Sequence, residues 1–166
     1  MMIRFWKDVK KYKRYIIISA ASELRAEVAN SYLNWLWWIL EPVAFMFIYA
    51  FIFGNVFGAR ESFFPLFIFI GITVWDFFSR TVTNSVKLVK NNKPIVSKVY
   101  LPKFILLLQK MGVNLFKMMI SFILVASMLV FYKVPLSWAF LYIVPVLMLL
   151  LLFTFGCSLF FMHFGV

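Results

Sequence analysis

The chain has 166 residues, of which 64% are hydrophobic and 21% aromatic, and its formal net charge is +11. An ordinary soluble domain contains about 45–50% apolar residues, so a soluble fold is excluded and the lipid bilayer has to act as the solvent. Seven basic residues lie between Arg4 and Arg25 and six between Lys87 and Lys110, a distribution typical of cytoplasmic segments of a membrane protein and not of a nucleic-acid-binding face.

The first predicted element is an amphipathic helix over residues 17–32, within a basic cytoplasmic segment that covers residues 1–34. Its apolar positions recur at helical spacing: Ile17, Ala20, Ala21, Leu24 and Val28. Its opposite face is polar: Ser19, Glu23, Glu27 and Asn30. We expect this elbow helix to lie in the membrane interface, with the preceding basic residues near anionic headgroups. The alternative is a cytosolic helix that packs on a partner domain. The segment is not a signal peptide, because its apolar run is too short and no cleavage site follows.

Four membrane-spanning helices are predicted in a transmembrane domain over residues 35–166. Their expected ranges are 35–57, 63–84, 111–132 and 138–164, with 104–110 extending the third span. Each is long enough for the ~20 helical residues that cross a bilayer. The short turns between the first and second spans and between the third and fourth carry only Arg60 and Lys133 as basic residues. Because basic loops stay in the cytoplasm, both termini are predicted inside. The fold class is all-α, a polytopic membrane protein with an N-terminal elbow helix and four spans.

Ionisable residues inside the spans are costly in hydrocarbon and therefore point to function. Asp76 and Arg80 are spaced i, i+4 on the second span, so they are predicted to form an intramembrane pair. Glu41 stands before Pro42 about two turns into the first span, within expected reach of headgroups or the elbow helix. Lys117 can extend its long stem to the cytoplasmic surface.

The sequence predicts no catalytic, metal-binding or cofactor-binding residue in this chain. No nucleophile stands at a credible spacing from a base, and no glycine-rich loop suits a nucleotide phosphate. Cys157 is the single cysteine and lies in an apolar run, where a small buried side chain is expected. Active transport would therefore draw its energy from a partner.

The loop over residues 86–103 is rich in lysine, contains no acidic residue and is punctuated by Pro94 and Pro102. A solvated positive loop would not need the apolar residues at Ile95, Val96, Val99 and Leu101. We therefore expect a short helix over residues 95–101 that docks on a cytosolic protein.

Four motifs, in this order, resemble those of one family. They are SYLNWLW at 31–37 followed by Pro42 and YAFIF at 49–53, GITVWDFF at 71–78, NNKPIVSKVYLP at 91–102, and Gly156 with HFGV at 163–166. In this pattern and over about residues 24–166 the chain resembles the permease subunit of ABC-type exporters of the second exporter class, the polysaccharide and polyol-phosphate export permeases. These carry O-antigen, capsule or teichoic acid polymers. Asn34, where many relatives have glycine, departs from the pattern.

The resemblance implies a function and a set of partners. The chain would be the membrane subunit of an ATP-driven exporter of lipid-linked polysaccharide or polyol-phosphate polymer in the bacterial plasma (inner) membrane. It would form a homodimer and bind a separate ATPase subunit that holds ATP and Mg²⁺, so it is not itself an enzyme. Relatives have six spans, and the chain ends where an arginine-aspartate pair would continue, so we expect it to represent the first four.

The resemblance also implies roles for particular residues. The ATPase-coupling loop would comprise Asn92, Pro94, Ile95, Val96, Lys98, Val99, Tyr100, Leu101 and Pro102. Trp75, Phe77 and Phe78 are the candidate pore residues, because aromatic rings stack on sugar faces. Two alternatives remain open: a permease of the same fold for a small amphiphile or drug, and a non-transporting scaffold or truncated remnant.

Overall fold

The computed structural model describes residues 2–29, 34–56, 63–97, 101–135 and 137–164, and these residues form helices and no strand. The helices are α1 (Met2–Ala29), α2 (Asn34–Phe51), α3 (Phe64–Asn91), α4 (Lys93–Val96), α5 (Lys103–Phe131) and α6 (Ile143–Phe164). A π-helical turn, Ile52–Val56, continues α2, and a 3₁₀ turn, Trp138–Tyr142, leads into α6.

The predicted all-α fold with four spans is confirmed. Four helical segments of the described chain are long and apolar enough to cross a membrane: Trp35–Gly54, Phe64–Asn91, Lys103–Phe131 and Phe140–Phe164. The second runs seven residues beyond its predicted end at Asn84. After Pro65 in the first turn of α3, the next proline is Pro94, so no proline breaks the backbone hydrogen bonds of α3 before it ends at Asn91.

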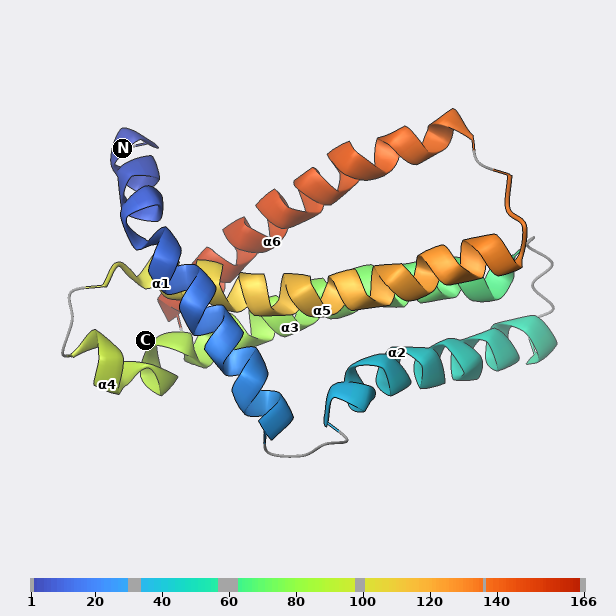
Figure 1. The fold of residues 1–166 in the computed structure, drawn as a ribbon, viewed down its shortest axis with the longest axis horizontal. Helices are drawn as coiled ribbons and strands as arrows, with labels where there is room; N and C mark the ends of the chain where they lie inside the picture. Colours follow the sequence, from blue (N-terminus) through green and yellow to red (C-terminus); the bar gives the residue numbers. More distant parts are fainter. Residues whose placement is uncertain (1, 30–33, 57–62, 98–100, 136, 165–166) are drawn as a thin grey trace.

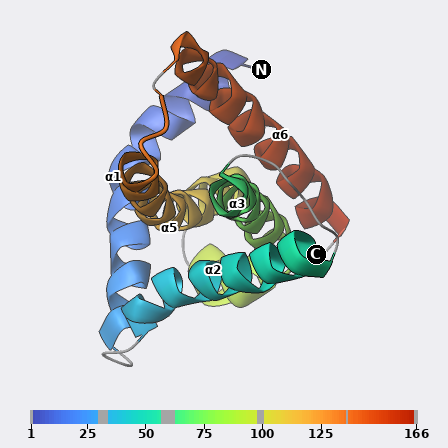
Figure 2. The same ribbon diagram turned by 90° about the vertical axis from the view of Figure 1, so that its right-hand side faces the viewer.

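α3 and α5 form the centre of the molecule, and α1, α2 and α6 surround them (Figure 2). Fully buried residues on α5, including Ile105, Leu106 and Leu107, pack with Phe77 of α3 and Met162 of α6. The buried residues of α6, Thr154, Ser158 and Met162, lie in its C-terminal half, and its N-terminal half diverges from α5 (Figure 1) while Leu147, Leu150 and Leu151 still pack against the core. This cluster joins α3, α5 and α6, and a second cluster, made by Met46, Leu66, Phe69 and Val125, joins α2, α3 and α5.

α1 is longer than the predicted elbow helix and lies across the bundle instead of along it (Figure 1). Tyr12, Tyr15 and Ile16 pack against the core, whereas Ile17 and Ile18 are exposed. Within the predicted apolar face, Ile17 is exposed and Ala20, Ala21, Leu24 and Val28 are partly buried. The side of α1 that faces the core and α5 instead includes Tyr12, Tyr15, Ile16, Glu23 and Glu27, a stripe at helical spacing that is rotated relative to the predicted apolar face where α1 crosses α5 (Figure 1).

Candidate functional site

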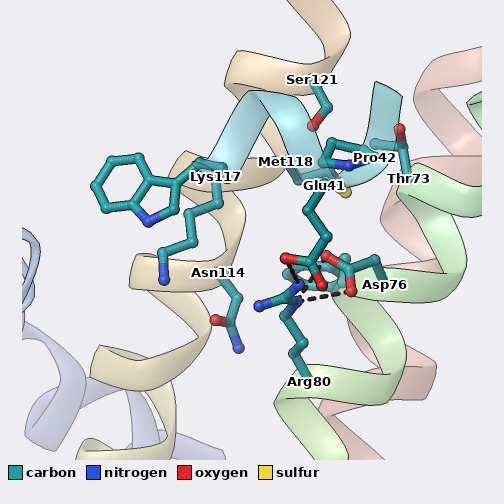
Figure 3. Close-up of a pocket in the computed structure, with 11 residues that line it drawn as sticks. Glu41, Pro42, Thr73, Asp76, Arg80, Asn114, Lys117, Met118 and Ser121 are labelled. Carbon is teal, nitrogen blue, oxygen red and sulfur yellow. Dashed lines mark hydrogen bonds and ion pairs between the residues drawn. The ribbon is translucent and has the colours of Figure 1, made fainter. Parts of the chain in front are cut away.

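Three charged side chains meet between α2 and α3 and are called the Arg80 cluster here: Glu41, Asp76 and Arg80 (Figure 3). Arg80 Nε lies 2.6 Å from Asp76 Oδ1 and 2.7 Å from Oδ2, and Arg80 Nη2 lies 2.7 Å from Glu41 Oε2. Two carboxylates thus share one guanidinium, which has enough donors in a planar fork to bind both.

Local structure explains how the cluster is placed. Asp76 and Arg80 stand one helical turn apart on α3, where side chains meet on one face. Glu41 precedes Pro42, which lies inside α2. A proline in a helix removes one backbone donor and weakens the helix locally, and the Glu41–Arg80 ion pair links α2 to α3 one residue before this proline. Glu41 thus contacts Arg80, where the sequence suggested headgroups or the elbow helix.

A small cavity of about 30 Å³ lies beside the Arg80 cluster. Trp38, Asn114, Lys117 and Ser121 also line it (Figure 3). The volume is enough for roughly one or two water molecules. The buried Asn114 of α5 donates a hydrogen bond from Nδ2 to Thr81 Oγ1 of α3 at 2.9 Å. Polar groups of three spans therefore converge at one depth of the bundle.

Two acidic residues of α1 bind lysines of α5. Glu23 accepts hydrogen bonds from Lys110 Nζ and from Gln109 Nε2, the latter at 2.6 Å. Glu27 Oε2 lies 2.7 Å from Lys117 Nζ, which also lies 5.1 Å from the centre of the Trp38 ring on α2. The face of α1 that the sequence indicated as polar and opposite the apolar one is therefore part of the contact with α5.

A larger groove, called the α2–α3 groove here, has a volume of about 530 Å³. Its lining is mostly aromatic or apolar, with acidic side chains at one end: Glu41, Phe45, Tyr49, Phe53, Phe67, Ile68, Gly71, Ile72, Trp75, Asp76 and Ser79. Phe45 stacks on Tyr49 at 6.3 Å between ring centroids, and Tyr49 stacks on Phe53 at 6.2 Å. Glu41 and Asp76 line both this groove and the small cavity.

Two of the three candidate pore residues, Trp75 and Phe78, contact each other with ring centroids 5.8 Å apart, whereas Phe77 faces another side of α3. Trp75 is 66% exposed and lines the α2–α3 groove. Phe77 is 2% exposed and belongs to the core, and Phe78 stacks on Phe153 of α6. Neighbouring residues of a helix point about 100° apart, so Trp75 and Phe78 stand about 60° apart on one side of α3 and Phe77 points to a different side. The sequence led to no predicted site role for Phe45, Tyr49 and Phe53, although their i, i+4 spacing places the three rings on one face of a helix.

The described part of the predicted coupling loop contains a short helix, Lys93–Val96, which begins two residues before the predicted start at residue 95. Asn92 donates a side-chain hydrogen bond to the Leu88 carbonyl at 2.8 Å, so it ends α3. Val96 packs against the core, Leu101 is buried in it, and Pro102 precedes the first residue of α5. Lys93, Pro94 and Ser97 are exposed. Lys98, Val99 and Tyr100 lie outside the described residues.

The described residues contain no group of three or more His, Cys, Asp or Glu side chains placed to hold a metal ion. Cys157 is partly buried as a free thiol.

Comparisons with known proteins agree with the resemblance seen in the motifs. The chain is 28% identical over 120 residues to an O-antigen export system permease protein RfbA of Myxococcus xanthus, covering 72% of this chain and 46% of the relative. Two proteins of the same name from Klebsiella pneumoniae are 25% and 24% identical over 147 residues, covering 88% of this chain and 57% of each relative. The chain thus spans about half the length of these relatives. No protein-family profile and no solved structure matches it.

The comparisons confirm the similarity to polysaccharide export permeases that the motifs indicated. Together with four long apolar helices, they identify a multi-pass protein of the inner membrane.

Proposed function

We propose that this chain, similar as it is to O-antigen export permeases, forms part of the membrane pathway of an ATP-driven exporter of lipid-linked glycans or polyol-phosphate polymers. The observation that carries the proposal is the α2–α3 groove, in which a row of aromatic rings ends at two carboxylates. Its volume of about 530 Å³ is within the range of small-ligand sites.

The lining of the groove suits the chemistry of a sugar. The stacked rings of Phe45, Tyr49 and Phe53, with Trp75 across from them on α3, offer flat apolar faces for the C–H faces of pyranose rings. Glu41 and Asp76 can accept hydrogen bonds from sugar hydroxyls, since ionised carboxylates are acceptors with several free lone pairs. A glycan would move along the rings without tight binding at any one of them.

The energy source in this proposal is a separate ATPase subunit that holds ATP and Mg²⁺. It would dock at the end of the bundle that carries α4, where Lys87, Lys90, Lys93, Pro94 and Ser97 are exposed. The inward positions of Val96 and Leu101 make these two residues anchors of the loop, so the exposed residues around α4 are the proposed contact. A second copy of the permease would complete the pathway.

Binding of a lipid-linked oligosaccharide tests this function directly. The chain in lipid nanodiscs is titrated with a fluorescent polyprenyl-pyrophosphate oligosaccharide, with the same lipid lacking sugar, and with a hydrophobic cationic dye. Saturable binding that requires the sugar supports a glycan path. Preferential binding of the dye would favour a permease for small amphiphiles, and binding of neither would overturn the transport proposal for this part of the protein.

A further inference from the structure

We propose that Lys117 is a positioning residue that exchanges between two carboxylates, Glu27 on α1 and Glu41 on α2. Through this exchange a displacement of α1 would open the α2–α3 groove. The inference goes beyond the proposed function, because it concerns how the groove is controlled and holds for any occupant.

Lys117 lies where three helices meet. Its ammonium binds Glu27 at 2.7 Å and stands 5.1 Å from the centre of the Trp38 ring. The lysine side chain is only 20% exposed and Glu27 is 28% exposed. Such a partly buried pair is screened less by salt and water than a surface pair, so the ammonium depends on its carboxylate partner.

The next carboxylate available to Lys117 is Glu41. Both residues line the small cavity of about 30 Å³, with Asn114 and Arg80 in its wall (Figure 3). The cavity is small, so its lining residues lie close together. Lys117 also contacts Trp38 of α2, which stands about one helical turn before Glu41. A change of rotamer along the flexible lysine stem is therefore a short movement through a polar space.

Displacement of α1 would make this exchange favourable. An ammonium without a partner at this depth is costly, so Lys117 would turn to Glu41 when Glu27 is withdrawn. Arg80 would keep Asp76, its neighbour on the same helix, because that pair needs no second helix. The Glu41–Arg80 bond between α2 and α3 would then be lost. Apolar contacts such as those of Met46 with Leu66 and Phe69 would still hold α2 on α3, so the groove would open at its charged end.

The second α1–α5 contact provides a matched control. Glu23 binds Lys110 and Gln109 in the same manner as Glu27 binds Lys117. Lys110 does not line the small cavity, however, so loss of Glu23 loosens α1 without releasing a lysine toward Glu41.

Thiol reactivity inside the groove measures its opening. In a Cys157→Ala background, which removes the single cysteine, Ser79→Cys places a near-isosteric thiol at the charged end of the groove. The full chain in detergent micelles is reacted with N-ethylmaleimide, and the remaining thiol is read as a gel shift with polyethylene-glycol maleimide. Ser97→Cys, on the exposed turn after α4, serves as the reference for general reactivity.

Three variants test the exchange. Glu27→Gln should raise the labelling rate at Ser79→Cys roughly three- to tenfold, in the range expected of coupled neighbours. Glu27→Gln combined with Lys117→Met should return to the parent rate, because no lysine is left to exchange. Glu23→Gln should stay near the parent rate. Equal labelling of Glu27→Gln and its parent, or equally fast labelling of the double variant, would overturn the exchange, whether or not the groove binds glycan. Size-exclusion profiles of each variant verify that it is folded.

Discussion

Arg80 on α3 donates a hydrogen bond from Nη2 to Glu41 Oε2 on α2 at 2.7 Å, although the two residues are 39 positions apart. The same guanidinium holds Asp76 on its own helix. The arrangement joins two spans at the charged end of the α2–α3 groove. The cluster therefore links α2 to α3 and also forms part of the proposed glycan path.

Replacement of Arg80 should destabilise the protein more than removal of the whole cluster. Arg80→Gln leaves two carboxylates without a cation, whereas Arg80→Gln with Glu41→Gln and Asp76→Asn leaves none. We expect a clear fall in the apparent Tm of the single variant in detergent and a partial recovery in the triple variant, measured by thermal shift. A triple variant less stable than Arg80→Gln would contradict the idea that the cation mainly compensates the two acids.

The aromatic row should determine affinity for glycan. Tyr49→Ala and Trp75→Ala each remove a ring that lines the groove, and the loss of one stacking contact of about 0.5–1.5 kcal/mol corresponds to a roughly two- to tenfold weaker Kd. The nanodisc titration with lipid-linked oligosaccharide checks this. Trp138→Ala is the control, because Trp138 is 90% exposed and is not in the groove lining; an equal effect at Trp138 would remove the groove from the glycan path.

Substitutions in the loop around α4 should affect docking of the ATPase and stability of the protein independently. Charge reversal by Lys90→Glu with Lys93→Glu changes exposed side chains only, so we expect loss of ATPase co-purification with an unchanged Tm. Leu101→Ala should do the opposite, since it cuts a side chain that is 7% exposed in the core, and such truncations cost about 2–5 kcal/mol in soluble proteins. If the lysine variants retain full association, the proposed contact surface is wrong.

The buried hydroxyl of Thr154 should be dispensable for stability. Thr154 Oγ1 is fully buried and has no hydrogen-bond partner among the described residues. Thr154→Val keeps the shape and removes a desolvated polar group that costs about 1–3 kcal/mol, so the apparent Tm should rise by about 2–4 °C or more. Thr73→Val is the matched control: Thr73 is also buried but donates to the Phe69 carbonyl at 2.8 Å, so no gain is expected. A fall in Tm for Thr154→Val would show that the hydroxyl has a partner in the folded protein.

Gly112 should accept a methyl group at the crossing of α1 and α5. A Cβ there would lie 3.9 Å from Ala20 Cβ, an ordinary contact distance. Alanine is favoured over glycine inside a helix by about 0.5–1 kcal/mol, so Gly112→Ala should raise the Tm by about 1–4 °C. Gly112→Leu, which is too large for the crossing, should lower it. Destabilisation by alanine would place α1 closer to α5 than described.

The sequence predicted the fold because its strongest signals are local. Apolar runs long enough to cross a bilayer gave the four spans, and the i, i+4 spacing brought Asp76 and Arg80 onto one face. Helix-to-helix contacts leave no such signal, so Glu41 was not assigned to Arg80, nor Glu27 to Lys117. Phe77 and Phe78 show the same limit, because aromatic character alone does not tell a core ring from a groove ring.

The ion pairs between α1 and α5 also bear on how the protein is made. Glu23 and Lys110 are 87 positions apart, so α1 leaves the ribosome well before the helix whose charges it neutralises. Lysines inside a span oppose its entry into the bilayer. Because α1 would already be folded along the membrane when α5 emerges, its Glu23 and Glu27 would neutralise the lysines of α5 as that span inserts. The first helix would in this way assist the insertion of a later span.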